Sequence, residues 1–338
     1  MKVIKCTKYG LPEVLKIVNV DKPIPKDNEV LIKNYATTVT VADCRVRGFE
    51  VPASFWLPAK FALGFSKPKQ SILGNELSGV IEVVGKNVKK FKVGDEVFAF
   101  TGHRFGAYAE FCCLDENDNI AVKPQKLSFE QSAALSFGGL TALHFLRKSN
   151  IKEGESILIY GASGSVGAYA VQLAKYFGVT VTGICSTGNQ ELVKKLGADT
   201  VIDYTKTDLS EINEKFDLVF DAVGKADISK SIRLIKPNGR YIHIATTPAT
   251  EIKIRLKLLN TKIKLIGGAY TATVEDLNFI RKLADEAFIT PVIDRQFDFN
   301  EMVSAHEYVD KGHKKGNVVI RIIDNDRLRS ENEPYKSQ

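Results

Sequence analysis

The chain has 338 residues, a formal net charge of +7, and 44% hydrophobic and 26% charged residues. This length suits two domains, and this composition is that of a folded globular protein rather than a disordered, collagen-like or disulfide-rich one. Five scattered cysteines without a CxxC pair, no secretory signal at the N-terminus and no apolar run approaching about 20 residues argue against secreted and membrane-spanning classes. We therefore expect a cytoplasmic protein with no membrane partner.

The first third of the chain carries short strand patterns separated by turns. Strands are expected at residues 29–36, 79–84 and 96–100, with a turn signal at 93–95. Short strands with frequent turns predict a compact, barrel-like domain. An apolar and basic segment with three prolines, residues 49–69, lies between these strands. We interpret it as a mobile lobe over a site in preference to a packed insertion.

After Pro124 the pattern changes to short apolar strands that alternate with helices. Such alternation indicates βαβ units on a parallel sheet, and continuous apolar strands fit a sheet buried on both faces. The tail from Asp324 onward is polar. The expected helices are residues 127–134, 140–148, 165–177, 190–196, 226–235 and 274–287, and the expected strands are 156–160, 179–184, 200–203, 217–221, 240–245, 263–267 and 317–323.

A glycine-rich turn between an expected strand and an expected helix gives the sharpest local signal. In the usual GxGxxG register Ala162 takes the first glycine place, Gly164 would let a pyrophosphate approach the backbone, and Gly167 would let the helix pack. The helix N-terminus would add N–H groups and a partial positive charge. The pattern predicts a dinucleotide site formed by Gly161, Ala162, Ser163, Gly164, Ser165, Val166 and Gly167.

The end of the next strand bears on which dinucleotide is bound. NAD-preferring sites commonly carry Asp or Glu there for the ribose hydroxyls, whereas this chain has Ser186 and Thr187. A carboxylate would repel the extra phosphate of NADPH, so its absence permits NADP(H). No Arg or Lys follows promptly, and both hydroxyls could also cap the following helix. We expect NADP(H), with NAD(H) as the alternative cofactor.

Further motifs recur in a fixed order along residues 1–323. The motifs are residues 42–48, 74–80, 93–97, 106–110, 139–142, the glycine-rich turn, 196–199, 202–204, 305–306, 312–313 and 316–320. Their shared order and spacing resemble the medium-chain dehydrogenase/reductase superfamily, and within it the zinc-free quinone oxidoreductase branch, which includes zeta-crystallin.

The resemblance implies an α/β fold. A Rossmann domain with a doubly wound parallel sheet would be inserted in a GroES-like β-barrel domain built from both ends of the chain. The expected boundaries are 1–125 for the GroES-like catalytic domain, 126–272 for the Rossmann dinucleotide-binding domain, 273–323 for the return to the catalytic domain, and 324–338 for the polar tail. We also expect a homodimer.

Position by position, the resemblance implies cofactor contacts outside the glycine-rich turn. Ser186, Asn189 and Tyr204 would flank the adenosine phosphate, while Gly268 and Ala269 would lie near the nicotinamide. Asn189 and Asn317 stand where relatives carry a lysine. The full expected set beyond the turn is Thr141, Ser186, Thr187, Asn189, Tyr204, Val223, Ala245, Thr246, Gly268, Ala269 and Asn317.

The positions that hold zinc in alcohol dehydrogenases of this superfamily carry other residue types here. The Gly-His-Glu motif has Asn75 in place of histidine, the first cysteine place is Thr40, and the linker place falls near Leu135. Hydroxyl, amide and alkyl groups do not replace thiolate and imidazole at a catalytic zinc. Cys44, one residue beyond Asp43, is interpreted as a small packed side chain. We therefore expect no zinc.

Without zinc, a quinone or an activated alkene is the favoured hydride acceptor, because its conjugated system spreads the charge that hydride delivery creates. Thr40 or Arg47 could stabilise an enolate or quinol oxygen, and Asp43 could orient them. Alternatively, Asp43 and Arg47 form a structural pair. Solvent is a further source of the proton.

The sequence thus predicts an NAD(P)H-dependent oxidoreductase, with NADPH preferred, that transfers hydride to a quinone or an α,β-unsaturated carbonyl. Two alternatives stay open: an alcohol dehydrogenase of the same superfamily, and an NADPH-binding protein without significant catalysis. The expected partner is a small-molecule electron acceptor. We expect no nucleic acid, since only residues 55–69 combine basic with aromatic side chains.

Overall fold

The computed structural model describes residues 1–51, 56–244, 248–268 and 270–322. The chain divides into two compact units, one made of Met1–Ser136 and the segment that begins at Ile293, the other of Phe137–Val292. The contacts within the chain divide it after Ser136 and again before Ile293, whereas the sequence predicts boundaries at residues 125 and 273.

The second boundary is shifted because helix α9 (Val274–Asp285) packs within the Phe137–Val292 unit. A Cβ on Gly139 of helix α4 (Ser136–Lys148) would meet the Ile280 side chain at 3.3 Å. The Arg147 guanidinium lies 4.4 Å from the centre of the Phe279 ring. Residues after position 272 thus complete the dinucleotide-type unit before the chain leaves it.

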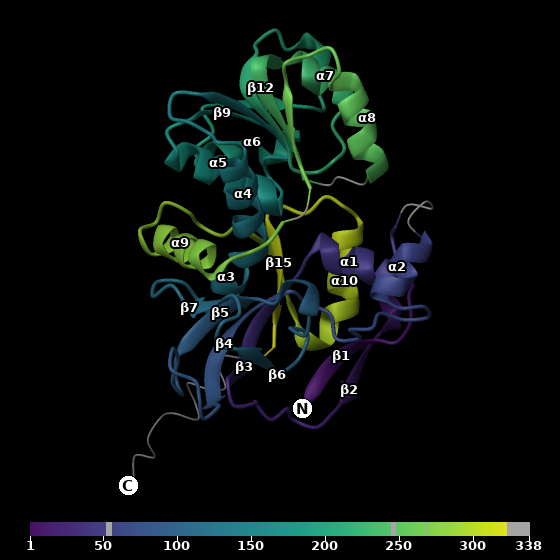
Figure 1. Ribbon diagram of the computed structural model, residues 1–338, viewed down its shortest axis with the longest axis vertical. Helices are drawn as coiled ribbons and strands as arrows, with labels where there is room; N and C mark the ends of the chain where they lie inside the picture. The colour runs from purple at the N-terminus through teal and green to yellow at the C-terminus, as the bar shows by residue number, and fades with distance from the viewer. Residues whose placement is uncertain (52–55, 245–247, 269, 323–338) are drawn as a thin grey trace. The chain divides into compact units, whose positions relative to one another are not determined.

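A parallel sheet forms the centre of the Phe137–Val292 unit (Figure 1). In the part that the structure describes, six strands lie in the order β10-β9-β8-β11-β12-β13. Counted along the chain this is 3-2-1-4-5-6, the order of a doubly wound dinucleotide-binding sheet, so the predicted Rossmann topology is confirmed. Its strands are β8 (Ser156–Tyr160), β9 (Thr180–Cys185), β10 (Thr200–Asp203), β11 (Phe216–Asp221), β12 (Ile235–His243) and β13 (Lys264–Ile266), and its further helices are α5 (Ser165–Tyr176), α6 (Gln190–Lys195), α7 (Ile228–Arg233) and α8 (Pro248–Leu258).

Helix α8 is the element of this unit that the sequence pattern does not predict. Its apolar residues Ile252 and Leu256, followed by Leu259, point outward and are 59%, 63% and 73% exposed. An amphipathic pattern normally marks a helix by its buried face. In α8 the apolar residues lie on both sides, because Ile254 and Leu258 are buried in the core of the unit while Ile252 and Leu256 are exposed, so the segment lacked a single apolar face.

The other unit is built around a long central strand, β3 (Glu29–Val39). The sheet order among its described strands is β14-β15-β3-β4-β5-β7, and β6 pairs with the first half of β3. Strand β15 pairs with the second half of β3 from the C-terminal part of the chain, so both chain ends build this unit, as the sequence predicts. Its other strands are β1 (Lys2–Cys6), β2 (Leu15–Asn19), β4 (Glu76–Val84), β5 (Glu96–Phe100), β6 (Phe111–Asp115), β7 (Ile120–Val122), β14 (Ile293–Asp298) and β15 (Asn317–Arg321), and its helices are α1 (Val41–Gly48), α2 (Trp56–Leu63), α3 (Phe129–Ala133) and α10 (Met302–Asp310).

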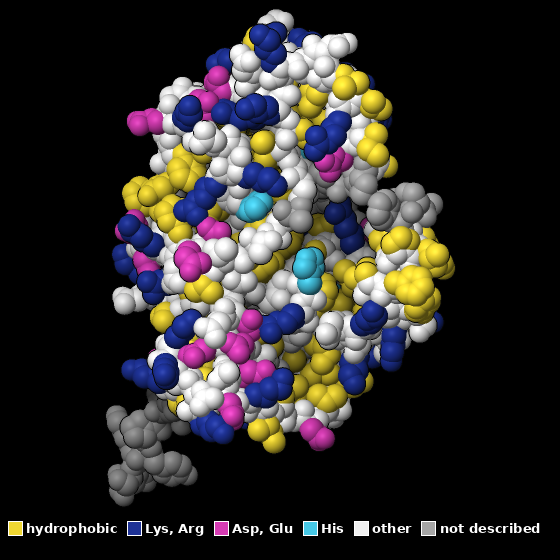
Figure 2. All heavy atoms as spheres, viewed as in Figure 1, with side chains coloured by type: hydrophobic (Ala, Val, Ile, Leu, Met, Phe, Trp, Pro, Cys, Tyr) yellow, Lys and Arg dark blue, Asp and Glu magenta, His cyan; other side chains and the backbone are white. Residues whose placement is uncertain are grey.

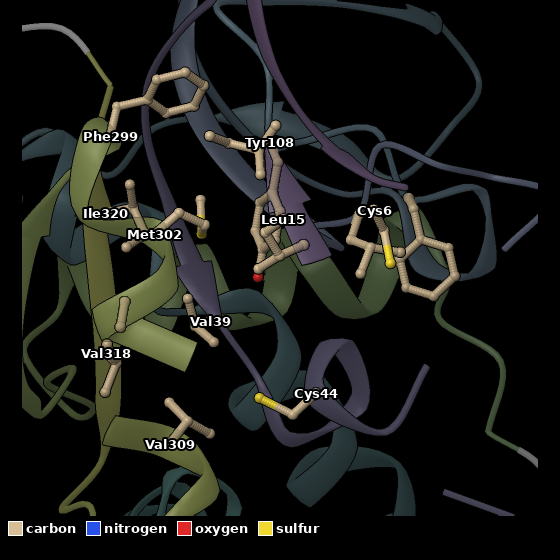
Figure 3. Close-up of a cluster of buried hydrophobic side chains, with 14 of the residues drawn as sticks. Cys6, Leu15, Val39, Cys44, Tyr108, Phe299, Met302, Val309, Val318 and Ile320 are labelled. Carbon is tan, nitrogen blue, oxygen red and sulfur yellow. The ribbon is translucent and has the colours of Figure 1, made fainter. Parts of the chain in front are cut away.

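One hydrophobic cluster joins the two chain ends within this unit (Figure 3). It contains Leu15 of the N-terminal hairpin, Tyr108, Met302 of α10 and Val318 of β15, all of them buried. Apolar side chains at this depth contribute about 1.5–3 kcal/mol each. The cluster holds α1 against α10, which determines the environment of the residues on α1.

The five cysteines are free thiols, as the sequence predicts, and Cys113 alone among them is partly accessible. Burial raises the pKa of Cys6 to about 11 and that of Cys112 to about 12. Burial likewise raises the pKa of Cys113 and of Cys185 to about 11, and it raises the pKa of Cys44 further. The protein therefore carries its thiols in the protonated form at neutral pH.

Helix α2 projects from its unit, and hydrophobic side chains gather over it in the space-filling view (Figure 2). Trp56, Leu57 and Phe61 are 52%, 56% and 62% exposed. The Lys60 ammonium lies 4.2 Å from the centre of the Phe49 ring, a cation–π contact that ties the helix down. Helix α2 itself contains no buried residue, and the role of the segment as a lobe over a site stays a prediction. In the part of the chain that the structure describes, no helix is long and apolar enough to cross a membrane.

Candidate functional site

The glycine-rich turn follows β8 directly and is fixed to the neighbouring strand. The Gly161 and Ala162 amides both donate to the Ile184 carbonyl, at 3.1 and 3.0 Å. Gly161 has a φ of +79°, and a Cβ there would lie 2.2 Å from the Val223 side chain. Glycine is therefore required at 161 for both its backbone conformation and its close approach.

Helix α5 begins at this turn with Gly164 as its N-cap, which offers no side chain to cap the helix. A Cβ on Gly164 would meet the Gly161 carbonyl oxygen at an ordinary 3.4 Å, whereas one on Gly167 would lie only 2.1 Å from that same oxygen. Gly167 is thus required for packing, while Gly164 leaves room beside a helix N-terminus. The space beside Gly164, the free backbone amides of the first turn and the positive end of this 12-residue helix together suit an anionic pyrophosphate.

Two of the predicted adenosine-side residues, Ser186 and Asn189, lie after the end of β9 and are hydrogen-bonded to Ser163 of the glycine-rich turn or to each other. The Asn189 amide donates to the Ser163 hydroxyl at 3.0 Å and to the Ser186 hydroxyl at 3.2 Å. This cluster joins the glycine-rich turn to the strand end where a ribose would lie. Its groups are neutral, so it can offer hydrogen bonds to a phosphate without repelling it.

Thr187 behaves differently from Ser186, because its hydroxyl donates to the Asp203 carboxylate at the end of β10. Gln190 and Thr205 donate to the same carboxylate, at 3.2 and 2.7 Å. The hydrogen bond from Thr187, followed by those from Thr205, lowers the pKa of Asp203 to about 2. Asp203 was missed as a site residue, although it stands in one of the motifs that carry the resemblance.

A second missed carboxylate positions a predicted cofactor contact. Asp221 is fully buried at the end of β11 and accepts from the backbone amides of Val223 at 3.0 Å, Gly224 at 2.7 Å and Ala226 at 3.2 Å. These bonds fix the turn that places Val223 against Gly161. The signal was an aspartate at the end of a buried strand.

The remaining predicted contacts are distributed over both units. Tyr204 is 47% exposed, with its ring 6.2 Å from that of Tyr160. The Thr141 hydroxyl donates to the Phe137 carbonyl at 2.6 Å, and Gly268 has a φ of +97°. Asn317 is 3% exposed and begins β15. The predicted contacts Ala245, Thr246 and Ala269 lie outside the described residues.

In the first unit, Thr40 and Asp43 form the capping box of helix α1. The Asp43 carboxylate accepts from the Thr40 amide at 2.9 Å, the Thr40 hydroxyl at 2.6 Å and the Gly74 amide at 3.0 Å. Burial raises the pKa of Asp43 to about 6, although the hydrogen bonds from Thr40, Gly74 and Tyr108 oppose that rise. Asp43 is fully buried, and Thr40 is 4% exposed.

Arg47 is 2% exposed and its side chain is held by residues far away in the sequence. It donates to the Gly10 carbonyl at 3.1 Å and to the His306 ring at 3.3 Å, and it pairs with the Asp310 carboxylate at 2.7 Å. The alternative of a structural role fits this burial, but the ion-pair partner is Asp310 rather than Asp43. His306, Tyr108 and Asp310 were missed because they approach α1 through tertiary packing.

The places of the zinc ligands are occupied by a hydrogen-bonded alcohol and amide. The Asn75 amide nitrogen donates to the Thr40 hydroxyl at 3.3 Å. The Asn75 amide oxygen is buried, and no described residue donates to it. Leu135, at the third place, is fully buried in the apolar interior. This set lacks the thiolate and imidazole groups that a catalytic zinc requires.

His306 makes stability depend on pH. Burial, followed by the nearby Arg47 charge, lowers its pKa from the ordinary 6.5 to about 3. Between those values the unfolded chain binds a proton that the folded chain does not, so this contribution to stability is lost as pH falls from 6.5 toward 3. The raised pKa of Asp43 acts in the opposite direction between about 6 and its ordinary 3.8.

We expect His306→Gln to reduce the loss of stability on acidification, by up to about 1.4 kcal/mol for each pH unit within the His306 window. Urea unfolding of wild type and variant at pH 7 and at pH 4 measures the difference. Equal losses in the two proteins would show that His306 accepts a proton without unfolding.

Two models of known protein families match the chain. A model described as alcohol dehydrogenase GroES-like domain matches residues 26–125, and one described as zinc-binding dehydrogenase matches residues 196–320. The first match falls in the unit that holds β3 and confirms the predicted GroES-like domain. Fold and site thus define a two-domain dehydrogenase or reductase.

Individual relatives show to which branch of this class of enzymes the chain belongs. The chain is 34% identical to the 2-methylene-furan-3-one reductase of Solanum lycopersicum, over 96% of this chain and 79% of the relative. It is 31% identical to the chloroplastic NADPH-dependent alkenal/one oxidoreductase of Arabidopsis thaliana, over 95% and 79% of the two chains. The structure of the quinone oxidoreductase from Coxiella burnetii superposes with a TM-score of 0.84 at 31% identity, covering 96% of this chain and 99% of that one. The chain belongs to the medium-chain dehydrogenase/reductase superfamily, in its quinone oxidoreductase branch.

Proposed function

We propose that the chain is an NADPH-dependent reductase that passes hydride to a quinone or to an alkene conjugated with a carbonyl. The observation that carries this proposal is the cradle at the start of α5, where Gly164 leaves room for a pyrophosphate beside the helix N-terminus. When bound, reduced nicotinamide would supply the hydride. The activities named for the tomato and Arabidopsis relatives support the class of acceptor.

We assign the cofactor to the Phe137–Val292 unit and the acceptor to the GroES-like unit. Thr40 would contact the acceptor oxygen, since its hydroxyl lies at the start of α1 between Asp43 and Asn75. The Asp43 carboxylate already accepts from the Thr40 and Gly74 amides, and the Arg47 guanidinium already donates to Gly10 and Asp310, so we assign both to holding Thr40 and α1 in place. This division keeps the three predicted residues but gives direct contact to Thr40 alone.

The neutral cluster of Ser163, Ser186 and Asn189 supports NADPH over NADH. Neutral hydrogen bonds contribute roughly 0.5–1.5 kcal/mol each, so we expect NADPH to bind on the order of tenfold to a hundredfold more tightly, since about 1.4 kcal/mol is tenfold. Ser186→Asp should reverse the preference, because it adds a repelling charge and a ribose acceptor together. Fluorescence titration of both cofactors measures this, with Ser186→Ala as the uncharged control. A wild type that prefers NADH would contradict the assignment.

A panel of acceptors tests the reaction. Purified protein, prepared without added zinc, is assayed at the nicotinamide absorbance with 1,4-benzoquinone, methyl vinyl ketone and a simple primary alcohol. We expect reduction of the quinone or the enone, no oxidation of the alcohol, less than one zinc per ten chains, and full activity after chelation. Alcohol oxidation that chelators abolish would make the protein an alcohol dehydrogenase. Tight NADPH binding without turnover of any acceptor would make it a binding protein.

We further propose a cytoplasmic homodimer. The five reduced thiols support that compartment. The exposed apolar stripe of Ile252, Leu256 and Leu259 supports self-association. Sedimentation of wild type and Leu256→Glu tests the oligomer, and a monomeric wild type would overturn it.

A further inference from the structure

Helix α2 has the composition of an interior helix, yet it contains no buried residue. Its sequence is WLPAKFAL, in which Lys60 is the one polar residue. A helix that is apolar on all sides normally lies inside a protein or a membrane. With eight residues, a length of about 12 Å, α2 is too short to span a bilayer. The helix therefore presents apolar surface that the described part of the chain leaves largely uncovered.

Four large apolar side chains make up what we call the α2 patch: Trp56, Leu57, Phe61 and Phe65, each of them more than half exposed. Leu57 and Phe61 stand four residues apart and so lie on one face of the helix. The Phe61 and Phe65 rings meet edge to face, with their centres 5.1 Å apart. Figure 2 shows hydrophobic side chains gathered over α2. Single exposed apolar residues are common, whereas a contiguous patch of large ones marks an interaction site.

The charges beside the α2 patch are positive. Residues 51–75 contain three lysines and no acidic residue. The Lys69 ammonium donates to the Phe61 carbonyl at 2.6 Å, and the Lys60 ammonium donates to the Phe65 carbonyl. These bonds hold two positive charges beside the aromatic residues at the end of the helix. An ammonium group has three N–H donors, so neither bond exhausts its capacity to bind an anion.

We propose that the α2 patch docks the protein on the surface of an anionic bilayer. Apolar side chains with lysines beside them bind such a surface, because the rings enter the boundary between headgroups and acyl chains while the ammonium groups meet lipid phosphates. Trp56 suits this boundary, where tryptophan is enriched, and the exposed Lys67 adds a third positive charge. The expectation of no membrane partner concerns a spanning segment, and docking on one leaflet needs none.

Two other occupants fit the α2 patch less well. Single-stranded nucleic acid stacks its bases on open ring faces, but the Lys60 ammonium lies 5.2 Å from the centre of the Trp56 ring and takes up one of its faces. A second copy of the chain, paired patch to patch, would bring the same three lysines of each copy together, and like charges oppose such association. An anionic lipid surface complements both the apolar side chains and the charge.

Trp56 is the only tryptophan of the chain, so its fluorescence reports on docking directly. The full chain is mixed with vesicles of phosphatidylcholine alone, or of phosphatidylcholine and phosphatidylserine in equal parts. We expect binding to the mixed vesicles, with the Trp56 emission shifted to the blue and quenched by brominated acyl chains. Binding to phosphatidylcholine alone should be at least about tenfold weaker, since each lysine near an anionic surface contributes about fivefold. Added salt should weaken binding to the mixed vesicles.

Two pairs of variants locate the contact. Phe61→Ser should weaken binding to the mixed vesicles about tenfold, because it removes one ring from the α2 patch. Phe288→Ser is its matched control, since Phe288 is 53% exposed and also meets one aromatic ring edge to face, that of Tyr176 in the other unit. Lys67→Glu should weaken binding by on the order of tenfold, whereas Lys195→Glu, at an exposed lysine of α6, should not. Urea unfolding and NADPH titration verify that each variant is folded.

The proposal is overturned if wild type binds neither kind of vesicle, if it binds while the Trp56 emission stays unchanged, or if Phe61→Ser and Phe288→Ser bind alike. Binding of a single-stranded oligoribonucleotide, lost in Phe61→Ser, without any binding to vesicles would make the patch a nucleic-acid site instead. A smaller sedimentation coefficient of Phe61→Ser, again without binding to vesicles, would make it a self-association surface. NADPH-dependent reduction is measured without vesicles, so its outcome is separate from this one.

Discussion

Replacing Gly164 by valine should reduce NADPH affinity at least a hundredfold while the protein stays folded. The branched side chain would fill the room beside the α5 N-terminus that a pyrophosphate needs, and its Cβ would meet the protein itself at an ordinary 3.4 Å. Fluorescence titration measures the affinity, and urea unfolding without cofactor measures the stability. The cost to the fold should stay near the 1 kcal/mol typical of point substitutions.

Gly167→Ala provides the opposite control. Its Cβ would lie 2.1 Å from the Gly161 carbonyl oxygen, so the helix must move and stability should fall by about 3 kcal/mol, the upper end of the usual cost of overpacking. The two glycines are three residues apart, yet one should report on binding and the other on packing. Normal NADPH affinity in a folded Gly164→Val protein would remove the cofactor from this turn.

Replacing Arg47 by methionine should destabilise the protein by about 3 kcal/mol, the lower end of the range for breaking a buried ion pair. The lower end applies because the side chain of Asp310 is 29% exposed and can be partly rehydrated. The substitution also removes the donors to Gly10 and His306. Urea unfolding at pH 7 measures the change in the free energy of unfolding.

Arg45→Met is the matched control, because Arg45 is exposed on the same helix and its loss should cost no more than about 0.5 kcal/mol. Any loss of activity in Arg47→Met is to be corrected for the folded fraction. An Arg47→Met protein as stable as wild type, but inactive, would favour direct contact between Arg47 and the acceptor.

The sequence predicts the dinucleotide unit well because its signals are local. Each parallel strand is a short apolar run, and the helix after the glycine-rich turn follows directly from the turn itself. The predicted strands at residues 156–160 and 200–203 coincide with β8 and β10. Helix α8 was missed because its apolar residues are divided between a buried side, with Ile254 and Leu258, and an exposed side, with Ile252 and Leu256, so the sequence shows no single apolar face.

Some residues of the candidate site could likewise be predicted from local sequence signals, whereas others depend on tertiary contacts. The cradle and Ser186 are readable because glycines and hydroxyls at a strand end have a local meaning. Asp203 escaped notice because its effect depends on which hydroxyl donates to it, and Thr187 does so from a separate strand end. His306 lies 259 residues from Arg47 in the sequence. Only the packing of α10 against α1 brings the two side chains into contact.

The protonated state of the cysteines has a consequence for a protein that handles conjugated carbonyls. Such acceptors are electrophiles that alkylate thiolates, and the thiolate rather than the thiol is the nucleophile. Burial raises the pKa of every cysteine of this chain, and even that of the partly accessible Cys113 is raised to about 11. The cysteine thiols, which a reactive substrate would modify most readily, are therefore kept in their unreactive protonated form. The same apolar packing that stabilises the fold thus also protects the enzyme from alkylation by its own substrate.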